Sequence, residues 1–163
     1  MLKGRVALVT GSVSGIGETT ARALAEMGCD IMLNGLGTDA EIERTKSTIA
    51  NDFGVTVKYH GADLAQRSAV EDLAKSTQDQ FGRCDILINN AVIRYYKKVV
   101  DMDPKEWDHA LAINLTAPVD LARLLLPGMI ENQWGRIVSM SSTLGLSGRS
   151  GRMDYIATKT ALI

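Results

Sequence analysis

Three residues near the end of the chain have types and an order suited to proton transfer. Tyr155 and Lys159 are spaced so that they share one face of a helix, and Ser142 precedes them. An ammonium beside a phenol favours the phenolate, so a tyrosine that ordinarily titrates near ~10 can exchange protons closer to neutrality. These residues predict an enzyme in which hydride transfer at carbon is matched by proton transfer at oxygen.

A glycine-rich turn follows the first expected strand. The apolar run 6–10 leads directly into Gly11, Gly15 and Gly17, and a helical hydrophobic period begins after them. Such a turn binds pyrophosphate: Gly11 permits the tight turn, Gly15 the close approach of backbone, and Gly17 close helix packing. A purely structural turn stays open as an alternative. A P-loop is disfavoured, because Glu18 stands where a lysine and a hydroxyl are expected.

The rest of the chain must position these two motifs. Strand and helix patterns alternate without a linker, a repeat or a low-complexity tract, which predicts one α/β domain over 1–163 with a parallel sheet. We expect strands at 6–10, 31–34, 55–59, 86–89 and 137–140, and helices at 17–28, 39–52 and 68–81.

Three of the expected helix starts carry capping signals. These are Thr38 with Glu41, Ser68 with Glu71, and Asp103 with Pro104 and Glu106. Pro118 lies within the next expected helix and predicts a kink or an irregular turn near Asn114.

The composition fits a soluble enzyme. Hydrophobic residues make up 45% of the chain and the formal net charge is -1. No uninterrupted apolar run approaches the ~20 residues of a membrane span, so we expect neither a membrane nor a nucleic-acid partner. The start of the chain has no cleavable apolar region, which predicts a cytoplasmic protein. Cys29, Cys84, His60 and His109 are expected to be packing or surface residues, and no metal site is predicted.

The motifs in combination resemble the short-chain dehydrogenase/reductase family over the whole chain. They are the 10–17 turn, Asn89-Asn90-Ala91, Asn114, Ser142 and Tyr155-x3-Lys159. Segments 34–43 and 61–64 look like those of bacterial 3-hydroxybutyrate dehydrogenases. The resemblance implies a Rossmann-like, doubly wound parallel sheet with strand order 3-2-1-4-5 and the cofactor at the carboxyl ends of the strands.

The resemblance also bears on the extent of the domain. Family members continue through further strand and helix units and a substrate loop, which are missing after Ile163. We therefore expect a C-terminally truncated domain whose fifth strand is an exposed edge, with a genuine short protein as the alternative.

The resemblance implies four catalytic residues. Tyr155 would exchange the proton, and Lys159 would favour its phenolate and hold the nicotinamide ribose. Ser142 would hydrogen-bond the reacting oxygen. Asn114 would hold a water that relays protons, although an asparagine at this position could instead only cap a kink.

The implied cofactor is NAD, with NADP as the alternative. Its implied contacts are Gly11, Ser14, Gly15, Ile16, Gly17, Asp63, Leu64, Asn90, Ala91, Tyr155 and Lys159. NAD is favoured because 34–36 offers neither a ribose-binding acid nor an arginine for a 2'-phosphate. Asp63 could instead merely end a strand. Val92 replaces the glycine of the family's Asn-Asn-Ala-Gly, and we expect it to restrict the backbone and crowd the cofactor wall.

The substrate prediction rests on Arg94 and Arg152, together with Ser142 and Tyr155. In 3-hydroxybutyrate dehydrogenases the two arginine positions hold an amide and a lysine that bind the substrate carboxylate, and an assisting histidine is Leu144 here. A guanidinium can bind a carboxylate through two hydrogen bonds. We expect a small hydroxy or keto acid such as 3-hydroxybutyrate; solvated loop charges are the alternative.

Other functions stay open at this stage. They are a sugar acid or 3-oxoacyl substrate, and a non-catalytic dinucleotide-binding or regulatory module. The catalytic residues disfavour the module, because a binder needs the glycines but neither Ser142 nor Tyr155. For the full-length protein the resemblance implies a homotetramer.

Overall fold

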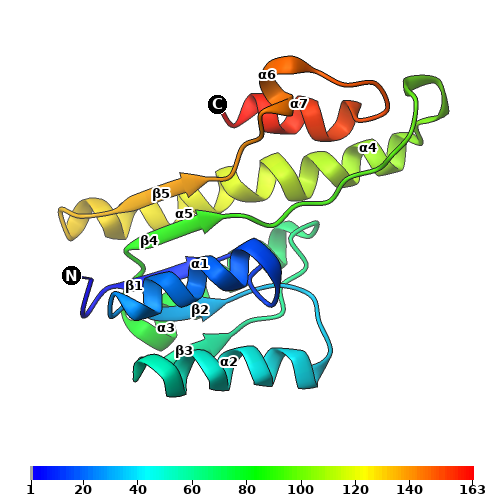
Figure 1. The fold of residues 1–163 in the computed structure, drawn as a ribbon. Coiled ribbons are helices and arrows are strands. Elements are labelled where there is room, and N and C mark those ends of the chain that lie inside the picture. The colour runs from blue at the N-terminus through cyan, green and yellow to red at the C-terminus, as the bar shows by residue number, and fades with distance from the viewer. Residues whose placement is uncertain (1) are drawn as a thin grey trace.

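Five parallel strands form one sheet in the order β3-β2-β1-β4-β5 (Figure 1). The computed structural model describes residues 2–163. The strands are β1 (Val6–Val9), β2 (Asp30–Leu33), β3 (Val57–Tyr59), β4 (Ile86–Asn89) and β5 (Arg136–Ser139). The predicted strand order and all five predicted strands are confirmed, with small differences in their bounds. The order reverses between β1 and β4, which is where doubly wound folds bind ligands.

Helices connect the strands. They are α1 (Gly15–Glu26), α2 (Asp39–Phe53), α3 (Arg67–Phe81), α4 (Pro104–Leu111), α5 (Ala117–Glu131), α6 (Leu144–Ser147) and α7 (Met153–Ala161). A short 3-10 turn, η1 (Val99–Asp101), precedes α4, and a π-helical segment, η2 (Ala112–Thr116), joins α4 to α5. In Figure 1, α7 lies beside α4 at the end of the domain that carries the carboxyl ends of the strands.

The two faces of the sheet carry separate hydrophobic cores. Leu8 and Leu87 belong to a core built with α3 and α5, whereas Ala7 and Ile86 belong to one built with α1 and α2. Adjacent strand residues divide in this way because successive side chains of a strand point to opposite faces. Both faces of the central strands are therefore covered, as parallel sheets require.

The predicted N-cap is confirmed for α2 but not for α3. Thr38 caps α2 in a complete capping box with Glu41, as predicted. The prediction of a cap at Ser68 is wrong, because α3 begins at Arg67 and its N-cap is Gln66. The chain already turns before that point, where Asp63 accepts hydrogen bonds from the N–H groups of Ala65 and Gln66.

The start of α4 confirms only part of its predicted cap. Asp103 is the N-cap, its carboxylate accepts a hydrogen bond from the N–H of Lys105, and Pro104 occupies the first turn. Glu106 does not complete a capping box. Its carboxylate pairs with Lys97 at 2.7 Å, which ties α4 to the segment after β4.

The irregular turn predicted near Asn114 is present as η2.

The continuous helical stretch Pro104–Glu131 is 28 residues long, and its length and apolar composition would allow it to cross a membrane. Its residues Leu121, Leu125 and Met129 are buried in the core with α3. The apolar composition of this stretch is therefore explained by its packing in the hydrophobic core.

The fifth strand, β5, is an exposed edge of the sheet, as expected. β5 pairs only with β4 within the described residues, and Ile137 and Val138 are 39% and 46% exposed. An apolar edge strand of this kind offers unpaired backbone groups to another chain.

Both cysteines are structural, as predicted. Cys29 and Cys84 are buried free thiols. Burial raises the pKa of the Cys29 thiol to about 11 and that of the Cys84 thiol to about 12, so both stay protonated and unreactive near neutral pH.

A buried carboxylate holds the amino ends of two central strands together. Asp85 is 1% exposed and accepts hydrogen bonds from Arg5 Nη1 at 2.9 Å, Arg83 Nε at 2.7 Å and the N–H of Val6 at 3.0 Å. Burial raises the pKa of the Asp85 carboxyl, but the hydrogen bonds outweigh burial and hold that pKa below its usual range.

Candidate active site

The glycine turn has the geometry of a phosphate cradle. A Cβ at Gly17 would lie 2.1 Å from the carbonyl oxygen of Gly11, so only glycine lets α1 approach the turn this closely. Gly11 and Gly15 have φ of 62° and 60°, which favours glycine. A Cβ at Gly15 would meet no atom within 4 Å, so the space over the helix start is open. The cradle therefore fits a pyrophosphate at the N-terminus of α1.

Other predicted cofactor residues surround an adjacent hollow of about 220 Å³. Gly11, Asp63, Leu64 and Ala91 line it, at the carboxyl ends of the strands. Further lining residues are Asn34, Gly35, Leu36, Val92, Ile93 and Ile113. Ser14 and Ile16 stand outside this hollow, exposed at the first turn of α1, where Ile16 is 66% exposed.

Asn90 braces the glycine turn. Its Nδ2 donates hydrogen bonds to the carbonyl oxygens of Thr10 at 2.9 Å and Gly11 at 3.0 Å. Thr10 Oγ1 in turn accepts hydrogen bonds from the N–H groups of Asn90 and Ala91. The end of β4 therefore fixes the shape of the cradle.

Val92 occupies the position where the family has glycine. Among residues 2–163, Gln133 is the non-glycine residue with positive φ, so Val92 does not adopt a conformation that favours glycine. Its side chain is 42% exposed and lines the hollow, where it forms part of the wall.

Lys159 is a buried cation beside the ring of Tyr155. Its Nζ lies 6.0 Å from the ring centroid, and the residue is 3% exposed. Burial lowers the pKa of the Lys159 ammonium. Nζ donates a hydrogen bond to the carbonyl oxygen of Met140, just beyond β5. The lysine thus joins the face of α7 that carries Tyr155 to the end of the sheet.

The loop after β5 carries two serines with different contacts. Ser142 Oγ accepts a hydrogen bond from the N–H of Leu144 at 3.2 Å, which fixes the entry into α6. Ser141 Oγ donates to the carbonyl oxygen of Lys159 at 2.7 Å. Ser141 therefore ties the loop to α7, and Ser142 lies next to this attachment.

Asn114 connects η2 to two neighbouring segments. Its Oδ1 accepts a hydrogen bond from the N–H of Ile93, and its Nδ2 donates to the carbonyl oxygen of Ile93, both at 2.8 Å. Nδ2 also donates to Thr158 Oγ1 at 3.2 Å. Both amide hydrogens are used, so the side chain has one fixed orientation between the segment after β4 and α7.

The two arginines predicted from the sequence lie near the same aromatic ring. The Cζ of Arg152 is 4.4 Å from the Tyr96 ring centroid, and the Cζ of Arg94 is 5.8 Å from it. Arg94 Cζ is also 6.0 Å from the centroid of the Tyr155 ring. The structure therefore brings both guanidiniums to Tyr96, and one of them, that of Arg94, also to Tyr155.

Sequence reasoning missed Tyr96 and Asp154. Asp154 is 1% exposed, and its Oδ2 accepts a hydrogen bond from the N–H of Tyr95 at 2.9 Å. It thus anchors the segment after β4 directly beside Tyr155. A buried aspartate in the first turn of a helix has no sequence signature that separates it from a surface one, so only the fold identifies it.

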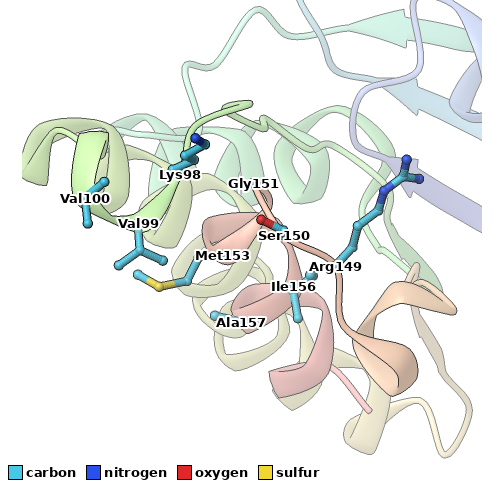
Figure 2. A pocket seen from close by; sticks show the side chains of 9 residues that line it. All are labelled: Lys98, Val99, Val100, Arg149, Ser150, Gly151, Met153, Ile156 and Ala157. Carbon is cyan, nitrogen blue, oxygen red and sulfur yellow. The ribbon is translucent and has the colours of Figure 1, made fainter.

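A different hollow, of about 590 Å³, lies behind α7 (Figure 2). Val99 of η1 and Met153 of α7 lie next to each other along it, and Ile156 and Ala157 of α7 also line it. Helical periodicity places these α7 residues on the side away from Tyr155 and Lys159. This hollow is therefore separate from the candidate catalytic face.

Comparison with known proteins agrees with this geometry. Residues 5–163 match the family described as short chain dehydrogenase. The chain belongs to that family. Its members are NAD(P)-dependent oxidoreductases with a Rossmann-like fold.

Particular members resemble the chain over nearly all of its length. It is 43% identical to D-beta-hydroxybutyrate dehydrogenase of Cupriavidus necator, over 100% of this chain and 62% of that protein. L-sorbose reductase of Gluconobacter frateurii, solved with NADPH and L-sorbose, superimposes with a TM-score of 0.94 at 31% identity, over 99% of this chain and 61% of that one. An NAD+-bound xylitol dehydrogenase gives 0.89 at 30% identity, over 98% and 61%.

The chain is shorter than the relatives that it matches. The chain spans about 62% of the length of the hydroxybutyrate dehydrogenase that it matches. The cofactor cradle and the candidate catalytic residues all fall within the matched part.

Proposed function

We propose that the full-length protein is an NAD-dependent dehydrogenase that interconverts a secondary alcohol and a ketone on a small hydroxy acid, such as 3-hydroxybutyrate. The observation that carries this proposal is the pair of cations at Tyr155. The Lys159 ammonium lies 6.0 Å from the ring centroid, and the Arg94 guanidinium lies at the same distance. A phenol that can exchange a proton thus stands next to a group that can bind a carboxylate.

The chain's own residues would perform the proton half of the reaction. NAD, when bound, supplies the hydride acceptor for oxidation, and its reduced form supplies the donor for reduction. Tyr155 Oη would give a proton to the ketone oxygen or take one from the alcohol. Lys159 would stabilise the phenolate by its charge. Ser142 Oγ would donate a hydrogen bond to the reacting oxygen.

The proton at Tyr155 must reach solvent for turnover to continue. Asn114 is our candidate to hold the relaying water. Because its side-chain amide hydrogens already bind Ile93 and Thr158, such a water would bind to main-chain groups of η2 or to the free lone pair of Oδ1.

NAD is the proposed cofactor over NADP. Gly11, Gly15 and Gly17 would hold the pyrophosphate, while Asp63 and Ala91 would lie against the adenosine part. Among residues 2–163, none of those lining the adjacent hollow is basic, so a 2'-phosphate has no cation to pair with there. Asn34, at the end of β2, uses its Nδ2 to hold the carbonyl oxygens of His60 and Ala62.

A hydroxy acid is favoured as substrate because the Arg94 guanidinium lies near Tyr155 and shares the Tyr96 ring with the guanidinium of Arg152. A sugar alcohol is the second candidate, since the chain is also 31% identical to an L-sorbose reductase. A neutral polyol has no carboxylate for Arg94 and Arg152 to bind. Initial rates with 3-hydroxybutyrate, xylitol and a 3-hydroxyacyl thioester, each with NAD and with NADP, distinguish these substrate classes.

The mechanism is tested by Tyr155→Phe in the full-length protein. The variant should bind NAD with an affinity near that of wild type, since the ring is kept, and lose most of its turnover, because the proton-exchanging hydroxyl is removed. Calorimetry measures the first quantity and NADH absorbance the second. A variant that turns over as fast as the wild type contradicts the mechanism. A wild-type protein that binds NAD but oxidises no substrate would instead favour a non-catalytic dinucleotide-binding module.

We further propose a cytoplasmic homotetramer. The outer face of α5 carries Val119, Leu126 and Ile130, which are 57%, 43% and 66% exposed. Covering such a face stabilises an assembly by burying apolar surface. Light scattering on the full-length protein measures the number of subunits.

A further inference from the structure

The segment after β4 alternates in exposure like an extended chain. Ala91, Ile93, Tyr95 and Lys97 are partly buried, whereas Val92, Arg94, Tyr96 and Lys98 between them are exposed. Successive side chains of an extended backbone point to opposite sides. One side of this segment therefore faces the protein, and the other is exposed; on the exposed side, Val92 lines the cofactor hollow and Arg94 lies 6.0 Å from the Tyr155 ring centroid.

The inward side is fastened to the catalytic elements. Ile93 is held through both its N–H and its carbonyl oxygen by Asn114 of η2. The N–H of Tyr95 is held by Asp154 of α7, and Tyr95 Oη lies 2.7 Å from Nδ1 of His109 in α4. The exposed side chains are consequently fixed relative to α7, which also carries Tyr155.

Tyr96 is the exposed aromatic ring that meets both arginines. The ring is within cation–π distance of Arg152, at 4.4 Å, and of Arg94, at 5.8 Å. The arginines come from different elements, one after β4 and one at the start of α7. Among residues 2–163, no carboxylate pairs with either guanidinium. Two unpaired cations near one ring form a site that an anion would complete.

We propose that Tyr96 is a specificity-determining positioning residue, which holds Arg94 and Arg152 together as a binding site for the carboxylate of the substrate. This inference rests on the proposed hydroxy-acid function. The ring limits the rotamers of two long side chains before substrate arrives, so less conformational freedom is lost on binding. Tyr96 acts through the arginines and takes no part in proton transfer.

The charge of the substrate separates this role from two simpler ones. An apolar wall would contact an acid and its methyl ester alike. A purely structural ring would lower the melting temperature and the activity on every substrate. A positioning role affects only the ligand that bears a carboxylate. It also depends on the ring and not on the hydroxyl, so phenylalanine should replace tyrosine.

The experiment compares Tyr96→Ala and Tyr96→Phe in the full-length protein with 3-hydroxybutyrate and its methyl ester. We expect Tyr96→Ala to raise the KM for the acid about 5-fold or more, with kcat and the KM for the ester within about 2-fold of wild type. Tyr96→Phe should keep both KM values. Val100→Ala is the control, because Val100 is 88% exposed in the neighbouring η1 and has no aromatic ring to offer a guanidinium.

A binding measurement separates positioning from turnover. Butyrate has the carboxylate but no hydroxyl, and calorimetric titration of the NAD complex should show weaker butyrate binding in Tyr96→Ala and unchanged NAD binding. Suppose the wild type prefers the acid to the ester. If Tyr96→Ala then raises KM equally for acid and ester, or for neither, the proposed role of Tyr96 is wrong, but the carboxylate site is not. A wild type without preference for the acid overturns the carboxylate site together with it.

Discussion

Replacing Gly17 by alanine should damage the fold, whereas the same change at Gly15 should mainly damage cofactor binding. At Gly17 the new Cβ would lie 2.1 Å from the oxygen and 2.7 Å from the carbon of the Gly11 carbonyl, and 2.6 Å from Asn90 Nδ2. Non-bonded carbon atoms sit best at roughly 3.5 Å or more, and the obstacle is backbone that cannot rotate away. The turn between β1 and α1 must therefore move.

The cost follows from the size of this overlap. Overpacking a close-packed site usually costs about 1–3 kcal/mol, and a clash with backbone belongs at the upper end, ~3 kcal/mol. A chain of this size loses roughly 2–4 °C of Tm per kcal/mol, which predicts a decrease of ~6–12 °C for Gly17→Ala. At Gly15 no atom lies within 4 Å, so only the positive φ opposes alanine, at about 1 kcal/mol or ~2–4 °C.

The assay pairs thermal unfolding with calorimetric titration of NAD on the same two full-length variants. Gly15→Ala should melt close to wild type and yet lose about 10-fold or more in NAD affinity, because its methyl group enters the space proposed for the pyrophosphate. Gly17→Ala should melt far lower and also bind NAD poorly. If the Tm values fall in the opposite order, the overlap argument is wrong. If Gly15→Ala binds NAD like wild type, the cradle is not where the pyrophosphate lies.

Two further predictions concern charged groups. Asp85→Asn should lower the free energy of unfolding by about 2 kcal/mol at pH 7. The control Asp79→Asn, at an exposed position, should leave the free energy of unfolding almost unchanged. The pKa of Asp85 is lower in the folded protein than in the unfolded chain. The ionised carboxylate therefore stabilises the fold at pH values above the pKa of the unfolded chain, and this stabilisation is lost as the pH falls through the pKa of the folded protein. The Tm gap between wild type and Asp85→Asn should therefore close in acid; a gap that persists to about pH 2 contradicts this. Arg152→Ala should raise KM for 3-hydroxybutyrate ~10-fold and leave its methyl ester unchanged, and equal effects would remove the carboxylate contact.

Local rules of the sequence were sufficient for most of the strands and helices, whereas the strand order was predicted from the family resemblance. An apolar run that enters glycines and then changes to a helical period is a local pattern, and it located the cradle at Gly11, Gly15 and Gly17. The spacing of Tyr155 and Lys159 fixes a shared helix face without any tertiary information. Thr38 and Glu41 form their capping box within a single turn. In each case the physics involves neighbours in the chain.

Local rules failed where another group competes for the same helix start or side chain. Ser68 has the sequence of a cap, yet the turn held by Asp63 starts α3 earlier. Glu106 has the sequence of a capping partner, yet Lys97 binds its carboxylate. A charged side chain takes the partner that the fold brings to it, and the sequence does not say which one that is.

The candidate substrate side of the site depends most on tertiary structure. Alternation along an extended segment relates Arg94 to Tyr96, but nothing local relates either of them to Arg152. They meet because Asn114 and Asp154 hold the segment after β4 against η2 and α7. The glycines of the proposed pyrophosphate cradle lie in one short continuous turn, so a local pattern could predict them, although Asn90 at the end of β4 also braces that turn. The proposed anion site uses side chains from separate elements, so only the packing of those elements creates it.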